Sequence, residues 1–321
     1  MIVIKLVGGL ASQLHKYAVV RSIAEKYNKE FKIDLSAYEE IEEKDVMKYG
    51  LPNIGLNPLI ADKKDIINSK SQTALGYILY SIVNVVTPVP FIGRLSRKTL
   101  NSLGSRSLTK KLIFNNSLTI HVSNDVSLNW INEVVNSDNC YIEAEFGLRF
   151  DIIDSIRSEL KEAVINTNIS ETAQKYLDQI KKCALPVSMH VRRGDYVTNK
   201  NVNDFHGVCD ETYYRKALKK YNDVKEVQIF VFSDDLDWVK QEFKGFLPKN
   251  TVFVSNNENY EDFLLMVNCS NHIVANSGFS SMSAWLSGTN ELNVTSPARW
   301  FIHEETNRNQ LQMLPKGWVY L

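Results

Sequence analysis

The second half of the chain alternates short apolar runs with helical patterns, and this alternation constrains the fold more than any other feature. The apolar runs that predict strands lie at 187–191, 227–232, 251–254, 272–275 and 291–294. The helical patterns between them lie at 213–221, 237–243, 260–268 and 279–286. Strands that alternate regularly with helices are typical of an α/β fold with a parallel, doubly wound sheet.

The first half opens in the same way. Residues 1–7 predict a strand, Gly8-Gly9 a turn, residues 12–27 a helix and residues 31–34 a second strand. The stretch from about 40 to 145 is helical in places and predicts a helical insertion. A chain of 321 residues is long enough for two cores. We therefore predict an N-terminal domain over 1–160 and a C-terminal domain over 161–321, with the boundary in the polar helical stretch near 155–182.

Composition excludes some classes of function. The formal net charge is +0, so no global field recruits nucleic acid, and any anion site must be built locally. The cysteines form no C-x-x-C pair and have no metal-ligand spacing with histidine, which predicts a reduced, cytoplasmic protein. They are Cys140, Cys183, Cys209 and Cys269. The N-terminus enters a strand directly, without the pattern of a signal peptide.

An apolar segment begins at Ala74 and continues to residue 93. Two prolines interrupt it before it reaches the roughly 20 residues that a membrane-spanning helix needs. Basic residues follow at once, namely Arg94, Arg97 and Lys98. The segment has two interpretations: a helix packed in the N-terminal domain, or an element lying on a membrane surface with a basic rim.

Polar clusters follow three of the predicted strands. They are His190–Asp195, Ser233–Asp235 and Asn276–Ser280. In a doubly wound sheet, ligands bind outside the carboxyl ends of the strands, which is where all three clusters fall. Adjacent arginines are costly to desolvate without an anionic partner, and the arginine fork matches phosphate geometry. The first ligand that this pattern indicates is a nucleotide diphosphate.

Strand alternation places His190 and Arg192 on one side and Arg193 on the other. We therefore predict that Arg192 contacts phosphate. Arg193 leaves an apolar face and needs a partner, for which Asp195 is the candidate. The alternative for the whole stretch is a structural ion-pair cluster at the end of a strand.

The other two clusters each have a structural alternative as well. Ser277 and Ser280, with nearby amides at a helix N-terminus, can hold phosphate oxygens. Asp234 or Asp235 can accept a hydrogen bond from a ribose hydroxyl or a purine N–H. Both pairs can instead be helix N-caps. Asp235-Leu236-Asp237 also reads as a D-x-D metal motif, a rival that we rank below the arginine site.

In combination, these segments resemble the bacterial α-1,2-fucosyltransferase family, glycosyltransferase family 11. The likeness covers the N-terminal loop and nearly all of residues 185–301. The matching segments are Gly8–Ala18, His190–Val197 (H-x-R-R-x-D), His206–Asp210 with Tyr213-Tyr214, Phe232–Asp235 with Trp238, Tyr260–Met266, Asn276–Ser280 and Pro297–Phe301.

The resemblance implies a GT-B architecture, with two Rossmann-like domains facing a cleft. It also implies an inverting transfer of L-fucose from GDP-β-L-fucose to the 2-hydroxyl of a β-galactoside, with no metal and no other cofactor. Charge that builds on the β-phosphate would be stabilised by Arg192 as the sugar passes through an oxocarbenium-like state. The donor-binding residues so implied are Gly8, Gly9, Gln13, His190, Arg192, Arg193, Asp234, Asp235, Ser277, Phe279 and Ser280.

The N-terminal loop departs from the family pattern. Ser12 stands where the family motif has asparagine, and a serine lacks the paired donor and acceptor of an amide. Ser281-Met282 stands where the family often has two tryptophans. The alternative function is therefore transfer of a related GDP-linked deoxysugar such as colitose. A more distant alternative is a non-catalytic nucleotide- or glycan-binding protein.

An inverting transfer needs a group that takes the proton of the acceptor hydroxyl. The candidates are Asp195, Asp204 and His206, the last two in a predicted loop, and we place Arg192, Asp195 and His206 in the catalytic set. The acceptor that the resemblance suggests is a galactoside of an O-antigen or capsule repeat unit, which can be lipid-linked. That would place the protein in the cytoplasm, at the inner face of the bacterial inner membrane, with the segment after Ala74 as its contact.

Overall fold

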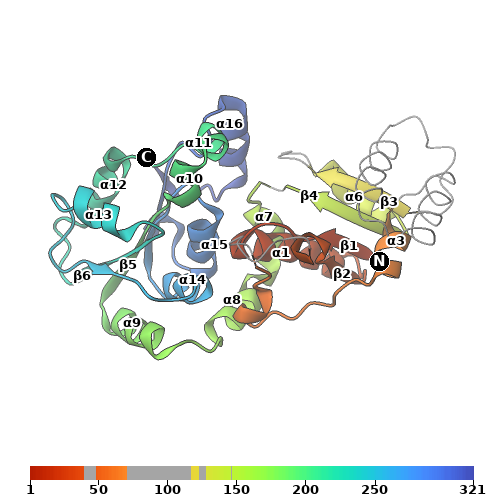
Figure 1. Ribbon diagram of the computed structural model, residues 1–321, viewed down its shortest axis with the longest axis horizontal. Helices are drawn as coiled ribbons and strands as arrows, with labels where there is room; N and C mark the ends of the chain where they lie inside the picture. The colour runs from red at the N-terminus through yellow and green to blue at the C-terminus, as the bar shows by residue number, and fades with distance from the viewer. Residues whose placement is uncertain (40–47, 71–116, 123–127, 146) are drawn as a thin grey trace.

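The computed structural model describes residues 1–39, 48–70, 117–122, 128–145 and 147–321, and Figure 1 shows their arrangement around two sheets. Every strand pair in both sheets is parallel, which confirms the α/β class. The predicted membrane-surface segment and its basic residues lie outside the described residues. Within the described ranges, no helix has the length and apolar character needed to span a membrane.

The N-terminal sheet has four strands in the order β2-β1-β4-β3. Its strands are β1 (Ile2–Lys5), β2 (Phe31–Asp34), β3 (Ser117–Val122) and β4 (Asn139–Ala144). The helices of this half are α1 (Leu10–Lys26), α2 (Ser36–Glu39), η1 (Leu51–Ile54), α3 (Lys63–Ser69) and α6 (Asn129–Asn136). β1, α1 and β2 confirm the predicted opening, whereas the patterns of the first half did not reveal β3 and β4.

Helices α7 (Phe150–Ile153), η2 (Asp154–Ile156), α8 (Arg157–Ile165) and α9 (Glu171–Lys182) lead from one sheet to the other. The predicted division after residue 160 falls inside α8. Leu160 there is fully buried and belongs to a core cluster shared by both halves. The domain boundary stays a prediction.

The C-terminal sheet has six strands in the order β10-β9-β8-β5-β6-β7. Its strands are β5 (Leu185–Val191), β6 (Val227–Ser233), β7 (Val252–Phe253), β8 (Asn271–Ile273), β9 (Val294–Ser296) and β10 (Val319–Tyr320). Its helices are α10 (Gly194–Thr198), α11 (Lys200–His206), α12 (Glu211–Leu218), η3 (Lys219–Tyr221), α13 (Leu236–Glu242), α14 (Asn259–Val267), α15 (Gly278–Ser287), η4 (Glu291–Asn293) and α16 (Glu304–Met313).

The predicted strand at 291–294 is wrong in its position. Residues 291–293 form η4 because the Asn290 side chain caps this turn and accepts a hydrogen bond from Leu292 N at 3.0 Å. The strand β9 begins only at Val294. The 204–206 segment is likewise not a loop, because Asn199 caps a helix there and accepts hydrogen bonds from the amides of Asn201 and Val202.

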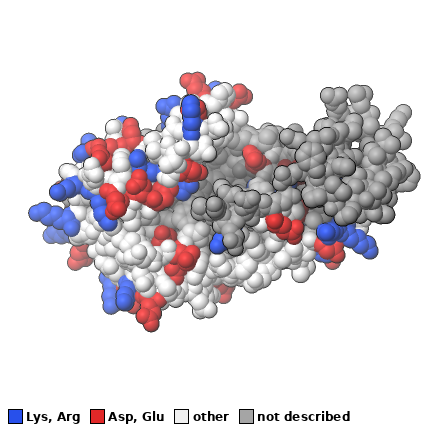
Figure 2. Space-filling model, in the orientation of Figure 1, with Lys and Arg blue, Asp and Glu red and all other residues white. Residues whose placement is uncertain are grey.

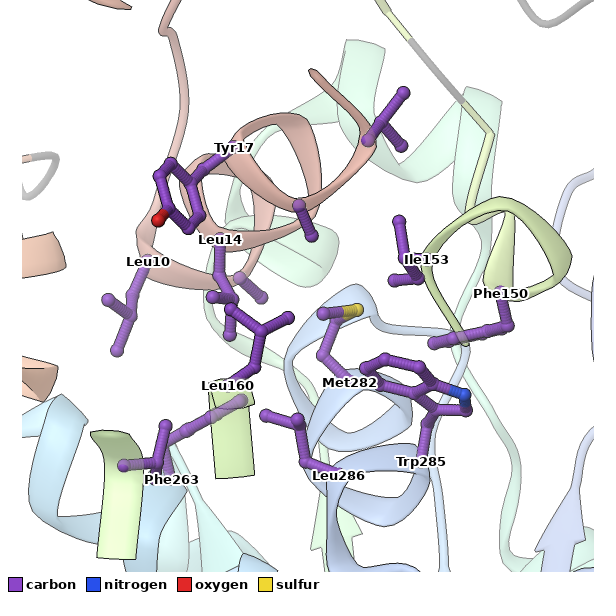
Figure 3. Packing of buried hydrophobic residues seen from close by; sticks show 14 of the residues in the cluster. Leu10, Leu14, Tyr17, Phe150, Ile153, Leu160, Phe263, Met282, Trp285 and Leu286 are labelled. Carbon is purple, nitrogen blue, oxygen red and sulfur yellow. The ribbon is translucent and has the colours of Figure 1, made fainter. Parts of the chain in front are cut away.

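One hydrophobic core joins the two halves. Figure 3 shows Leu14 of α1 facing Met282 and Leu286 of α15, with Phe150 of α7 beside Trp285. The Phe150 ring lies 5.4 Å from Trp285, measured between ring centroids. Because α1 and α15 bury apolar side chains against each other, each sheet is fixed in position relative to the other.

Charged side chains of both signs are mixed on the surface of the C-terminal half. On the face that Figure 2 shows, basic and acidic groups lie beside one another there and do not separate into a basic and an acidic region. This mixture fits the formal net charge of +0. An anion that binds on this side is therefore held by particular side chains and not by a broad positive field.

Candidate active site

The order of the C-terminal sheet reverses direction between β5 and β8. The chain steps from β5 to β6 and β7 on one side, then crosses to β8, β9 and β10 on the other. A crevice forms outside the carboxyl ends of the strands at such a reversal, and ligands bind there in open α/β sheets. The arginine motif follows β5 and Asn276–Ser280 follows β8, so the topology brings these two predicted clusters to that crevice.

Arg192 lies between two carboxylates. Its Nη2 is 2.5 Å from Asp195 Oδ1 and its Nη1 is 2.7 Å from Asp234 Oδ2. The register explains the second contact, since Val191 of β5 pairs with Ser233 of β6 and the next residues continue side by side. The Arg192 side chain is 33% exposed, so its fork is accessible to an anion. The prediction that Asp195 is the partner of Arg193 is therefore wrong, because Asp195 pairs with Arg192.

Arg193 has a different environment. Its Nε donates to Asp235 Oδ2 at 3.0 Å, and its guanidinium carbon lies 3.5 Å from the ring centroid of Trp238. Asp235 also accepts from Trp238 N at 3.3 Å and so caps α13, which confirms the N-cap interpretation for this residue. Asp237, the second acid of the D-x-D pattern, is 98% exposed and contacts Lys240. Over the described part of the chain, no group of histidine, cysteine or acidic residues is arranged to hold a metal ion.

His190 is buried near the end of β5. Its Nδ1 lies 3.0 Å from Ser280 Oγ, and its carbonyl accepts from the Tyr214 hydroxyl at 3.0 Å. Burial, with a smaller contribution from the Arg192 charge, lowers the pKa of His190 to about 3. His190 is therefore neutral at pH 7.

The start of α15 packs against His190. Ser277 Oγ accepts from Phe279 N at 3.3 Å and caps the helix, while Ser280 Oγ accepts from Ala275 N at 3.2 Å. The Phe279 ring packs 5.8 Å from the His190 ring. Both serines thus support the local backbone. Their predicted contact with phosphate stays a prediction.

His206 lies in a stack of aromatic rings. Its ring is nearly parallel to that of Tyr196, with 4.6 Å between centroids, and 5.0 Å from that of Phe301. Its Nδ1 is buried without a hydrogen-bond partner among the described residues. Burial lowers the pKa of His206, with Asp195 opposing and Arg192 adding to that effect. Asp204, the third candidate base, instead pairs with Lys200 at 2.5 Å on the surface.

The N-terminal loop is held by its own side chains. Gly8 has φ +89°, a conformation that favours glycine. Gln13 is fully buried: its Nε2 donates to the carbonyls of Gly8 and Lys48 at 2.9 and 2.8 Å, and its Oε1 accepts from Gly50 N. Ser12 Oγ donates to the Val7 carbonyl at 3.1 Å. Gln13 and Ser12 thus shape the loop, while Gly9 has open space around its Cα.

Asn276 holds the site together, a role that its place in the motif did not reveal. Its Nδ2 donates to the carbonyls of His206, Gly207 and Trp300 at 3.1–3.3 Å, and its own carbonyl accepts from the Tyr196 hydroxyl at 3.2 Å. A signal was present, because the side-chain amide of an Asn in the loop after a strand can donate hydrogen bonds to loop carbonyls.

Comparison with known proteins identifies the family. Residues 130–321 match the sequence model for glycosyl transferase family 11. The chain belongs to glycosyl transferase family 11. This confirms the resemblance drawn from the motifs, and the chain is a glycosyltransferase.

Two relatives from Escherichia coli are similar to this family 11 glycosyltransferase. An alpha-1,2-colitosyltransferase is 28% identical over 99% of this chain and 98% of its own length. The O-antigen biosynthesis glycosyltransferase WbnK is 36% identical over 48% of this chain and 50% of its own.

Among solved structures, one of Arabidopsis thaliana FUT1 is similar to this chain, with a TM-score of 0.45 and 10% sequence identity. The match covers 90% of this chain and 68% of the FUT1 chain. The fucosyltransferase NodZ from Bradyrhizobium is also similar, with a TM-score of 0.44 and 15% sequence identity. The match covers 88% of this chain and 92% of the NodZ chain.

Proposed function

We propose that this glycosyltransferase transfers L-fucose from GDP-β-L-fucose to the 2-hydroxyl of a β-galactoside, with inversion and without a metal ion. The observation that carries the proposal is the position of Arg192, at the reversal of the sheet and between Asp195 and Asp234. A guanidinium held in place before the reaction stabilises charge as it develops, at no cost of reorganisation.

In this mechanism, the acceptor oxygen forms a bond to the anomeric carbon while the bond to the β-phosphate oxygen breaks. The electron pair of that bond leaves with GDP, whose new charge is taken up by Arg192. The neutral His190 supplies a polar group without adding a charge. The acceptor proton goes to Asp195 or His206. Tyr196, the residue after Asp195, stacks on the His206 ring, so the two candidates lie close enough for the Asp195 charge to act on His206.

A second donor has support of its own. The relative matched along nearly the whole chain is named a colitosyltransferase, and Ser12 departs from the family loop motif. GDP-colitose is therefore the second candidate donor. The name of WbnK supports an acceptor from O-antigen assembly.

The experiment offers GDP-fucose and GDP-colitose separately to a panel of β-galactosides, with and without excess EDTA. We expect transfer from GDP-fucose that EDTA leaves intact, and an α-1,2 bond in the product by NMR. Faster transfer from GDP-colitose would replace the first donor by the second. Activity that EDTA abolishes and Mn²⁺ restores would contradict the role of the arginines. GDP binding with no transfer to any acceptor would favour the non-catalytic alternative.

We also propose that the protein contacts the inner face of the inner membrane through its apolar and basic segment. Replacing the three basic residues by serine should weaken sedimentation with anionic vesicles, because each contributes about 1 kcal/mol near such a surface. Unchanged sedimentation would favour the packed-helix interpretation. These residues are Arg94, Arg97 and Lys98.

A further inference from the structure

Phe205 is exposed beside the site, although large aromatic side chains are normally buried. It exposes 47% of its surface, and it is the only phenylalanine or tryptophan among the exposed large hydrophobic residues of the described ranges. Val208 (40% exposed) follows shortly after it in the sequence, and Ile302 (42% exposed) lies beside it in the structure. Exposed apolar groups that gather at one place mark a binding surface more often than those scattered singly.

The Phe205 ring rests on a fixed support. Its centroid lies 4.9 Å from the buried Phe301 ring and 4.8 Å from the His206 ring, which it meets edge to face. The Phe205 carbonyl accepts from Ile302 N at 2.9 Å, so the two exposed side chains are carried by paired backbone. A ring supported in this way loses little conformational freedom when a ligand covers it.

The loop after Phe205 is fixed as well. Asn276 binds the carbonyls of His206 and Gly207. Gly207 has φ +65°, and Ile302 Cδ1 lies 2.8 Å from the point where a Cβ on Gly207 would stand. The Ile302 side chain therefore lies directly over the glycine, while its backbone is bonded to that of Phe205.

This surface adjoins the reactive cluster. From Phe205, the stack continues through His206 to Tyr196, and the Arg192 guanidinium carbon lies 5.4 Å from the Tyr196 ring centroid. A molecule that covers Phe205 thus lies beside His206, a candidate for receiving the acceptor proton, and Tyr196 links that histidine to Arg192.

We propose that Phe205 and Ile302 form a stacking platform for a pyranose ring of the acceptor. A galactopyranose presents C–H groups on one face, which suit the negative face of an aromatic ring, while its hydroxyls stay at the rim within reach of polar groups. Beside the platform, Asp204 pairs with Lys200 and Glu304 is exposed, so this flank is not a basic patch of the kind that binds an anionic membrane surface. This inference rests on the proposed function, since it names the acceptor side of the same site.

The test compares initial rates as the acceptor concentration is varied. Phe205→Ala should raise the KM for the galactoside about 3- to 10-fold, the range expected for losing one aromatic contact. Phe205→Tyr should restore the KM, because it keeps the ring. The affinity for GDP, measured by calorimetry, should not change in either variant. Leu292→Ala, at an exposed apolar residue of η4, serves as the control for general effects of surface substitution.

An unchanged acceptor KM in a folded Phe205→Ala variant would overturn the platform. A loss of GDP affinity in that variant would overturn it too, since Phe205 would then support the donor site. Binding of a β-galactoside to the wild-type protein and to Phe205→Ala, followed by saturation-transfer NMR, tests the platform without any turnover. Failure of the proposed reaction is therefore distinguishable from failure of the platform.

Discussion

Replacing Arg192 by alanine separates a chemical role of this residue from a structural one. The change removes the fork from between Asp195 and Asp234 and leaves two carboxylates without their shared cation. If Arg192 stabilises the leaving diphosphate, the main loss falls on the transition state, in which that group gains charge. We therefore expect the turnover number to fall much further than the stability of the fold.

The expected losses of unfolding free energy and of kcat follow from the surroundings of Arg192. The Asp195 and Asp234 side chains are 43% and 26% exposed and that of Arg192 is 33% exposed, so solvent screens both ion pairs. Partly exposed pairs contribute about 0–1 kcal/mol each, which limits the loss of unfolding free energy to about 2 kcal/mol. Loss of one preorganised donor to a developing oxyanion costs on the order of 10²- to 10³-fold in kcat.

The assay measures GDP release at saturating donor and acceptor, together with the Tm of the same preparations. Arg192→Lys is the matched variant, because it keeps the charge but cannot bridge two carboxylates or a diphosphate with a planar fork. We expect kcat in the order wild type, lysine, alanine, with small changes in Tm. Near-normal turnover of Arg192→Ala would mean that this guanidinium does not stabilise the leaving group. A Tm that falls in proportion to activity would reassign Arg192 to a structural cluster.

Two further predictions concern packing around Gly194 and around the buried histidines of both halves. A Cβ on Gly194 would stand 2.5 Å from Asp234 Oδ2. Gly194→Ala should therefore displace that carboxylate from Arg192 and lower kcat about tenfold. The control is Gly245→Ala, which should leave kcat unchanged because its Cβ would meet its nearest neighbour only at 4.0 Å. Burial lowers the pKa values of three buried histidines below their unfolded value near 6.5. The stability that their neutral forms contribute is therefore fully present above pH 6.5. It is lost as the pH falls towards 4, by about 1.4 kcal/mol per pH unit for each histidine. They are His15 (pKa about 4), His190 (about 3) and His272 (about 3). Urea unfolding at pH 7 and pH 5 measures this loss, and His272→Asn should remove the part of it that His272 contributes; an equal loss in the variant would contradict the assignment.

The second half of the chain could be predicted well from its sequence because its strands are buried on both faces. Val187 and Met189 are buried on one face of β5, and Ser188 and His190 on the other. In β6 the neighbouring residues Ile229 and Phe230, which point to opposite faces, are both fully buried. Such strands appear as short apolar runs whose ends are marked by polar residues. The polar clusters after β5, β6 and β8 followed from the same pattern, and the parallel topology then brought them together.

The parts that the sequence did not reveal depend on long-range partners. The choice of Asp234 as a partner of Arg192, and of Asp235 as the partner of Arg193, is set by the register between β5 and β6, which no local pattern specifies. β3 and β4 were missed because their exposed and buried positions mix polar with apolar residues. The role of Asn276 depends on carbonyls that lie about 24 and 70 residues away in the sequence.

A crystal structure of the protein with GDP is the sharpest test of the phosphate-binding role of Arg192. We expect the Arg192 guanidinium within about 3 Å of a β-phosphate oxygen, donating N–H groups that Asp195 and Asp234 leave unused. A structure in which both carboxylates still hold Arg192, while the diphosphate lies out of its reach, would show that the arginine does not take up the charge of the leaving group.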